Sequence, residues 1–257
     1  MIWFPTPLAA TLSLSPLWKI PLLVPGAHLA ALGMTPPNPP PTAAEKAKYE
    51  GSGKGDNLAT FMRVSGKLWK IRIALFYIGA LCESAALLSR FLPEHAREPV
   101  ERLLVSSGAP GPAHIRFTPL WLGGVLLMGG AACLRLWAFR TLGRFFTFEM
   151  SVKQDHRLVT SGPYAVVRHP AYVSVLLLNV GVVTTSFAPG SWYAECVGWG
   201  SPASKAFGAL WATWSLIVPV LLMTRVNKED EVMRAQFGEE WEAWARRTPY
   251  KLVPYIY

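Results

Sequence analysis

The sequence is poor in charge and in cysteine. Only 16% of its 257 residues are charged and 51% are hydrophobic, whereas an ordinary soluble domain carries about a quarter charged residues. This deficit excludes a disordered chain or a nucleic-acid-coating protein and indicates a membrane protein. Eleven Trp and eight Tyr fit a bilayer, because these amphipathic rings favour its interface. The cysteines, Cys82, Cys133 and Cys196, lack CxxC spacing and are odd in number, which argues against a disulfide framework.

Several catalytic signatures are also missing. The chain has no GxGxxG, GxxxxGK[ST], HExxH or GxSxG segment, so the minimal parts of nucleotide-binding, P-loop, zincin and hydrolase sites are missing. Its five histidines have no metal-ligand spacing, and we predict no metal site. The net charge of +9 does not indicate nucleic acid, since the basic residues lie between apolar runs rather than in one block.

The apolar runs predict an all-α, integral membrane bundle of about five spans. A helix needs about 20 apolar residues to cross the hydrocarbon core. Four runs meet this demand, at residues 68–91, 118–139, 170–194 and 206–224. Pro219 is tolerable inside a packed bundle. Glu83 and Arg135 are costly within spans, and we expect Glu83 to pair with a neighbour and Arg135 to snorkel.

The first 32 residues are apolar but interrupted by five prolines. A cleaved signal peptide is one interpretation, yet no basic region precedes the apolar stretch, and we favour an irregular first span. Residues 35–56 are rich in proline and glycine and suit an exposed linker. We therefore divide the chain into an N-terminal segment with its linker, residues 1–67, and a membrane core, residues 68–257.

Basic residues predict the orientation of this core, because short cytosolic loops retain Lys and Arg. Residues 45–70, 140–168 and 225–251 hold 17 of the 25 basic residues. With five spans, all three segments fall on one face, which would be cytosolic. A soluble cosubstrate should therefore meet a loop at 140–169 and a C-terminal cytosolic helix at 225–257.

Two segments on this face stand out. Residues 155–172, DHRLVTSGPYAVVRHPAY, form a polar loop that runs into the longest apolar span. Residues 225–238, RVNKEDEVMRAQFG, begin where the last span ends, and Arg225 and Glu229 share a helix face at spacing i,i+4. Taken separately, the first could be a re-entry loop with a snorkelling arginine. The second could be a solvated helix whose tryptophans, Trp241 and Trp244, rest on headgroups. Their shared boundary favours a joint role.

Together, LVTSGPYAVVRHPAY and the later RxxxE and FGEEW resemble the isoprenylcysteine carboxyl methyltransferase family of membrane enzymes. The resemblance covers roughly residues 115–257. It implies an endoplasmic-reticulum enzyme that uses S-adenosylmethionine to methylate the C-terminal carboxylate of a prenylated cysteine in CaaX-processed proteins. The implied partners are prenylated proteins with a C-terminal isoprenylcysteine and membrane lipid. No nucleic-acid partner is implied.

The resemblance also implies site residues. Arg225 would position the acceptor carboxylate. The cofactor contacts would be Glu149, His156, Arg157, Leu158, Val159, Tyr164, His169, Pro170, Ala171, Tyr172 and Glu229. The sequence departs from the family pattern at Glu149, where an amide is expected, at Trp241 in place of a tyrosine, and at Ser174 in place of a glycine.

Two other functions stay open from the sequence. A related membrane methyltransferase could act on a phospholipid amine or another small lipid, although Arg225 suits an anionic acceptor better. A transporter or scaffold could also carry charged loops at the membrane boundary.

Overall fold

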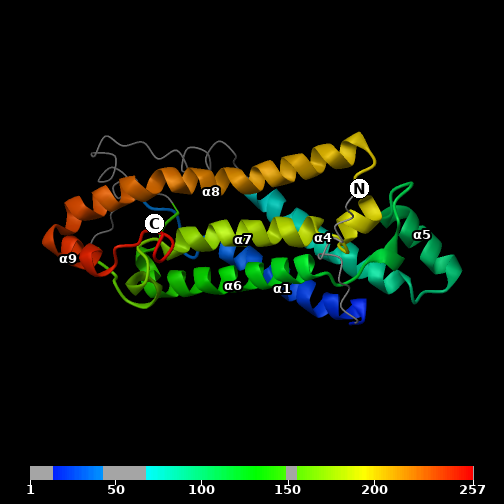
Figure 1. Cartoon of the computed structure of the whole chain (residues 1–257), viewed down its shortest axis with the longest axis horizontal. Helices are drawn as coiled ribbons and strands as arrows, with labels where there is room; N and C mark the ends of the chain where they lie inside the picture. The colour runs from blue at the N-terminus through cyan, green and yellow to red at the C-terminus, as the bar shows by residue number, and fades with distance from the viewer. Residues whose placement is uncertain (1–13, 43–67, 149–154, 257) are drawn as a thin grey trace, which may run out of the picture. The chain divides into compact units, whose positions relative to one another are not determined.

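The computed structural model describes residues 14–42, 68–148 and 155–256, and every regular element in these ranges is helical. Figure 1 shows them in chain order. The α-helices are α1 (Ile20–Met34), α4 (Leu68–Ser89), α5 (Glu94–Leu104), α6 (Pro119–Leu142), α7 (Pro170–Phe187), α8 (Pro202–Phe237) and α9 (Glu239–Arg247). Short 3-10 turns lie at Pro16–Lys19, Pro112–His114, Gly143–Phe145 and Gly162–Ala165, and a π-helical turn at Tyr193–Val197. The all-α prediction is confirmed.

Within the described residues, five helices are long and apolar enough to cross a membrane: Pro16–Met34, Lys70–Ser89, Pro119–Phe145, Pro170–Phe187 and Pro202–Phe237. The prediction of a multi-pass membrane protein with about five spans is therefore confirmed. We predicted an irregular first span over residues 1–32; its described part is a 3-10 turn followed by α1, which continues through Pro25, and residues 1–13 lie outside the described residues. Pro16 begins the 3-10 turn and Pro21 is the second residue of α1, positions at which the missing N–H of proline is tolerated.

The ends of two spans differ from the prediction. Helix α7 stops at Phe187, not at residue 194. The reason is Pro189, which disfavours helical backbone in the residue before it, followed by Gly190 at φ +85°. Helix α8 continues from the last span through the charged segment to Phe237, with Pro219 inside it. The predicted boundary at residue 225 therefore does not interrupt the helix.

The chain forms two compact units. Unit 1 takes the described residues of Met1–Ala30, Lys70–Gly129 and Leu178–Ser215. Unit 2 takes those of Ala31–Trp69, Gly130–Leu177 and Leu216–Tyr257. The predicted division at residue 67 follows sequence composition and stays a prediction. Both predicted motifs belong to unit 2.

Unit 1 packs its helices around an apolar core. One buried cluster comprises Leu23, Ala27, Ala80, Phe117, Trp121, Val125 and Ala188. Helices α6 and α7 approach closely here, because a Cβ on Gly181 would lie 2.5 Å from the backbone nitrogen of Met128. Any larger side chain at Gly181 would force the two helices apart.

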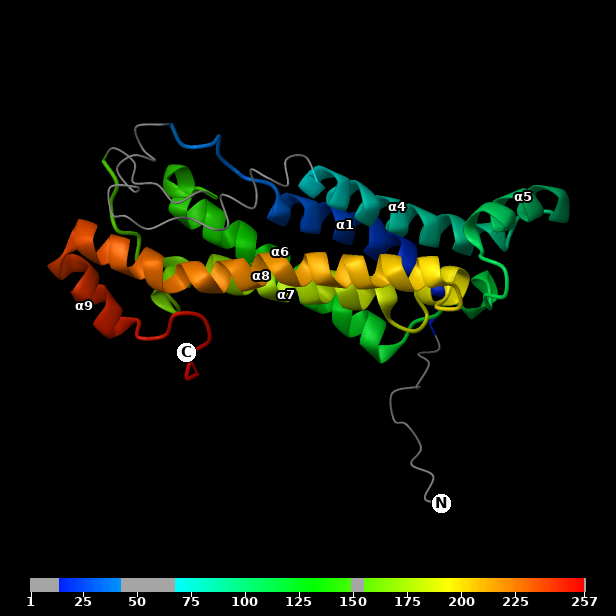
Figure 2. The same ribbon diagram turned by 90° about the horizontal axis from the view of Figure 1, so that it is seen from above.

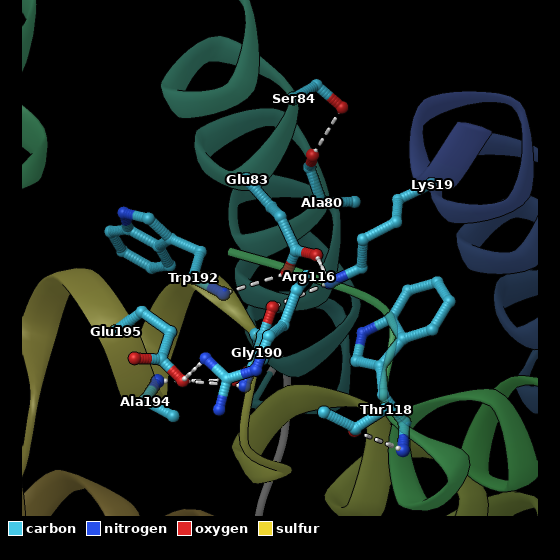
Figure 3. A network of polar contacts seen from close by, with 12 residues as sticks. Lys19, Ala80, Glu83, Ser84, Arg116, Thr118, Gly190, Trp192, Ala194 and Glu195 are labelled. Carbon is cyan, nitrogen blue, oxygen red and sulfur yellow. Dashed lines mark hydrogen bonds and ion pairs between the residues drawn. The ribbon is translucent and has the colours of Figure 1, made fainter. Parts of the chain in front are cut away.

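A buried polar network crosses unit 1 (Figure 3). Lys19, fully buried, forms an ion pair with Glu83 and donates to the carbonyl of Gly190 at 2.8 Å. The second Glu83 oxygen accepts from the backbone N–H of Trp192 at 2.9 Å. Glu195 in turn accepts from the N–H of Gly190 at 2.7 Å. The expectation that Glu83 pairs with a neighbour is confirmed, and the partner comes from the N-terminal span.

Candidate functional site

Unit 2 has an aromatic core that brings α9 back onto earlier parts of the chain. Its buried cluster comprises Ala138, Phe139, Phe146, Tyr164, Ala171, Trp241 and Trp244. The indole N–H of Trp244 donates to the Tyr164 carbonyl at 3.1 Å, and Figure 2 shows α9 turning back from the end of α8. Both tryptophans are therefore core residues, which contradicts the alternative that they rest on headgroups.

The turn at Arg168, His169 and Pro170 is held by the C-terminal segment. Pro170, fully buried, is the first residue of α7. The two backbone N–H groups before it donate to the carbonyls of Tyr250 at 2.9 Å and Lys251 at 2.8 Å. These bonds tie the two residues that precede α7 to the C-terminal segment.

One carboxylate that the sequence prediction missed binds two side chains of this turn. Asp230, buried on α8, lies 2.9 Å through Oδ1 from Nε2 of His169. Its Oδ2 lies 3.2 Å from Nη2 of Arg168. The Arg168 side chain is 9% exposed, so it does not snorkel. The available signal was an acid next to Glu229, the residue that the motif had already singled out.

The two sequence motifs meet at Tyr172. Its hydroxyl donates to Oε2 of Glu229, and its ring stacks on that of His169, with centroids 5.2 Å apart. The guanidinium of Arg225 lies 6.0 Å from the Tyr172 ring centroid. Arg225 is 4% exposed and donates from Nη1 to the carbonyl of Phe148 at 2.7 Å. Four of the predicted site residues are thus brought together.

The remaining predicted residues differ in placement. His156 stacks on Phe145 with centroids 4.9 Å apart and rings nearly parallel, and Leu158 packs against the aromatic core. Arg157 is exposed and Val159 is half-buried. Glu149 lies outside the described residues.

Arg135 is a buried cation beside these residues. Its Nη1 donates to the Ala171 carbonyl at 2.7 Å, and its Nε donates to that of Gly33. Its guanidinium lies 4.8 Å from the ring of Phe139 and 5.4 Å from that of Phe148. The prediction that Arg135 snorkels is therefore wrong, because carbonyls and aromatic faces receive its charge inside unit 2.

Tyr164 stays a neutral phenol in this environment. Burial raises the pKa of its hydroxyl far above the ordinary value of 10.0, and the carboxylate of Glu229 raises it further. At neutral pH, Tyr164 can donate a hydrogen bond but carries no charge.

The arrangement combines opposite charges with flat aromatic surfaces inside one unit. Arg225 and Arg135 can hold an anion, Glu229 can hold a cation, and the stacked rings offer apolar faces. Such a donor set suits a ligand that carries both charges and an aromatic group.

Comparisons with known proteins confirm the resemblance. Residues 124–199, less than a third of the chain, match the Isoprenylcysteine carboxyl methyltransferase (ICMT) family. This range includes the RHPAY motif and ends before the second motif begins.

Curated relatives match over about half of the chain. The chain is 32% identical over 139 residues to the cobalt-zinc-cadmium resistance protein CzcN of Cupriavidus metallidurans, covering 53% of each. It is 27% identical to protein-S-isoprenylcysteine O-methyltransferase B of Arabidopsis thaliana, over 48% of this chain and 53% of that protein. It is also 27% identical to the Delta(14)-sterol reductase erg24 of Schizosaccharomyces pombe, over 42% of this chain and 21% of that protein. The chain thus spans about half the length of the first two relatives.

Proposed function

We propose that this chain transfers a methyl group from S-adenosylmethionine to the C-terminal carboxylate of a prenylated cysteine in CaaX-processed proteins. The observation that carries the proposal is the meeting of the two motifs in unit 2, where Tyr172 binds Glu229 next to the buried Arg225. The likeness to a methyltransferase family and to a named isoprenylcysteine O-methyltransferase supports the reaction class.

The residues of unit 2 fit S-adenosylmethionine, which supplies the methyl group when bound. Glu229 can hold its cationic part, and the stacked His156 and Phe145 rings offer a face for its adenine. We propose that the lining is completed by Glu149, Arg157, Leu158, Val159, Tyr164, His169, Pro170, Ala171 and Tyr172.

The acceptor needs positioning more than activation. A C-terminal carboxylate has a pKa of about 3.5 and is ionised at neutral pH, so the site requires no general base. The planar guanidinium of Arg225 can hold it through two parallel hydrogen bonds, and Arg135 is a second candidate for this role. Holding the carboxylate in line with the methyl group and away from water would supply much of the acceleration. The apolar spans would accommodate the prenyl chain.

We place the enzyme in the endoplasmic-reticulum membrane with the loop 140–169 and residues 225–257 on the cytosolic side. The distribution of basic residues supports this orientation. A prenylated protein would reach the site from the cytosol while its lipid stays in the bilayer.

A phospholipid amine is the competing acceptor within the same reaction class. Two buried guanidiniums favour a carboxylate over an ammonium group, because like charges repel. A radiolabelled methyl-transfer assay on purified protein, with a farnesylated cysteine analogue and phosphatidylethanolamine as separate acceptors, tests the choice. We expect label only in the cysteine analogue, and label only in the phospholipid would overturn the proposal. Absence of S-adenosylhomocysteine binding would instead indicate a non-enzymatic membrane protein.

A further inference from the structure

We infer that Asp230 is a positioning residue, which holds the Arg168–His169 turn and fixes the tautomer of His169. The inference rests on the proposed function only for its effect on the cofactor. Each oxygen of the Asp230 carboxylate has one partner, His169 Nε2 at 2.9 Å and Arg168 Nη2 at 3.2 Å. All three side chains are buried or nearly so.

The chemistry of the three groups leaves one arrangement. An ionised carboxylate can only accept hydrogen bonds, and an arginine can only donate them. The Nε2 atom of His169 must therefore carry a proton, in both the neutral and the charged ring. In the neutral ring this places the lone pair on Nδ1, so Asp230 decides which nitrogen of His169 can accept a hydrogen bond.

The other contacts of the turn explain why this task falls to Asp230. The backbone is fixed by the carbonyls of Tyr250 and Lys251. The neighbouring Glu229 holds the Tyr172 ring that stacks on His169. Both sets of contacts fix position without choosing a tautomer. Only Asp230, among the contacts described for His169, binds a ring nitrogen.

Replacing Asp230 by asparagine keeps the shape and reverses this choice. The amide presents one oxygen and one NH₂ group in place of the two carboxylate oxygens. Arg168 can only donate, so it takes the oxygen. The NH₂ group then faces Nε2 of His169, which must offer its lone pair. We therefore expect the proton to move to Nδ1 in Asp230→Asn.

Nitrogen NMR of ¹⁵N-histidine-labelled protein in detergent micelles measures this directly. The chain has five histidines, and His169→Gln identifies the signal. We expect a protonated Nε2 in the wild type and a protonated Nδ1 in Asp230→Asn. S-adenosylhomocysteine affinity should fall roughly tenfold in that variant, because the hydrogen bond between residue 230 and His169 loses its charged partner. Glu94→Gln also replaces a carboxylate by an amide, at an exposed position of α5. It should change neither the His169 tautomer nor the affinity for S-adenosylhomocysteine.

The outcomes separate the two proposals. An unprotonated, neutral Nε2 in the wild type overturns the role of Asp230 without any variant, even should Asp230→Asn fail to fold. An unchanged tautomer in a folded Asp230→Asn overturns it as well. A tautomer change in a protein that binds no S-adenosylhomocysteine upholds the positioning role and contradicts the proposed function instead.

Discussion

Buried charges in both units are matched by specific partners. Lys19 meets Glu83 in unit 1, and Asp230 meets Arg168 and His169 in unit 2. Removing one partner of a buried pair leaves an uncompensated charge, whereas removing both leaves an apolar contact. At the scale of residues, single and double substitutions should therefore behave differently.

The Lys19–Glu83 pair provides the clearest case for stability. Lys19→Met should lower the free energy of unfolding by about 3–5 kcal/mol, because Glu83 is then buried without its cation. The double variant Lys19→Met/Glu83→Met should recover part of that loss, because no charge is left unpaired, although the Trp192 N–H and the Gly190 carbonyl then lose their side-chain partners. Thermal unfolding in detergent compares the three proteins, and a double variant that is less stable than Lys19→Met would contradict the pairing argument.

Arg225 and Glu229 should differ in what they affect. Arg225→Ala should slow methyl transfer by roughly one to two orders of magnitude, and Arg225→Lys should restore little because a point charge cannot reproduce the planar fork. Glu229→Ala should instead weaken S-adenosylhomocysteine binding in a calorimetric titration. Arg234→Ala, an exposed change on the same helix, is the control. Near-normal methyl transfer by both Arg225→Ala and Glu229→Ala would contradict the roles proposed for these two residues.

Tyr164 should make stability depend on alkaline pH. Its pKa is raised in the folded protein by burial, so the unfolded chain releases this proton first, from about pH 10. Stability should therefore fall as pH rises through 10 and beyond. Tyr164→Phe should lose less stability than the wild type between about pH 9 and 11, as measured by unfolding temperature at each pH. Parallel curves for the two proteins would show that Tyr164 ionises freely.

The membrane-spanning helices were predictable from hydropathy, but several of their ends were not, and neither were the short charged helices α5 and α9. An apolar run does not reveal that Pro189 and Gly190 end α7, since neither residue interrupts the hydrophobic character. Nor does a change from apolar to charged residues end α8, because both segments favour helix. The bonds from the start of α7 to residues 250–251 join segments far apart in sequence, and no local pattern indicates them.

From these bonds we predict that the C-terminal segment supports the turn at the start of α7. Truncation after Thr248 removes the carbonyls that accept from Arg168 and His169. We expect loss of S-adenosylhomocysteine binding with helical content, measured by circular dichroism, largely kept. Truncation after Pro254 leaves both carbonyls in place and should bind normally. Equal binding by the two truncations would mean that the turn needs no support from this segment.

For the molecule as a whole, composition predicted a membrane protein, and the positions of the two motifs predicted that they lie close together. His169, Tyr172, Arg225 and Glu229 come together in unit 2 as the motifs implied. The contacts of Asp230 with His169 and of Arg135 with the Ala171 carbonyl were not predicted, because they depend on which distant groups surround each side chain. An acid beside an acid gives no signal in the sequence, and an arginine in an apolar run indicates a cost without naming the groups that bind it.

The orientation of the whole chain in the membrane can be tested by cysteine labelling. Single cysteines at Ser151 and Ala235, in a background without native cysteines, should react with a membrane-impermeant thiol reagent in sealed microsomes. The basic residues near both positions should keep them on the cytosolic side. A cysteine at Ser201, in the loop before α8, should react only after the membrane is opened. The reverse labelling pattern would show that the chain has the opposite orientation in the membrane.

We propose that the chain forms a methyl ester on a prenylated cysteine, and its reaction product tests this directly. Purified protein, radiolabelled S-adenosylmethionine and N-acetyl farnesyl cysteine should yield label that mild base releases as methanol. The matched acceptor with a carboxamide in place of the carboxylate should yield none, because it offers neither the nucleophilic oxygen nor the negative charge that Arg225 would hold. Base-stable label, or equal labelling of the acid and the amide, would contradict the account.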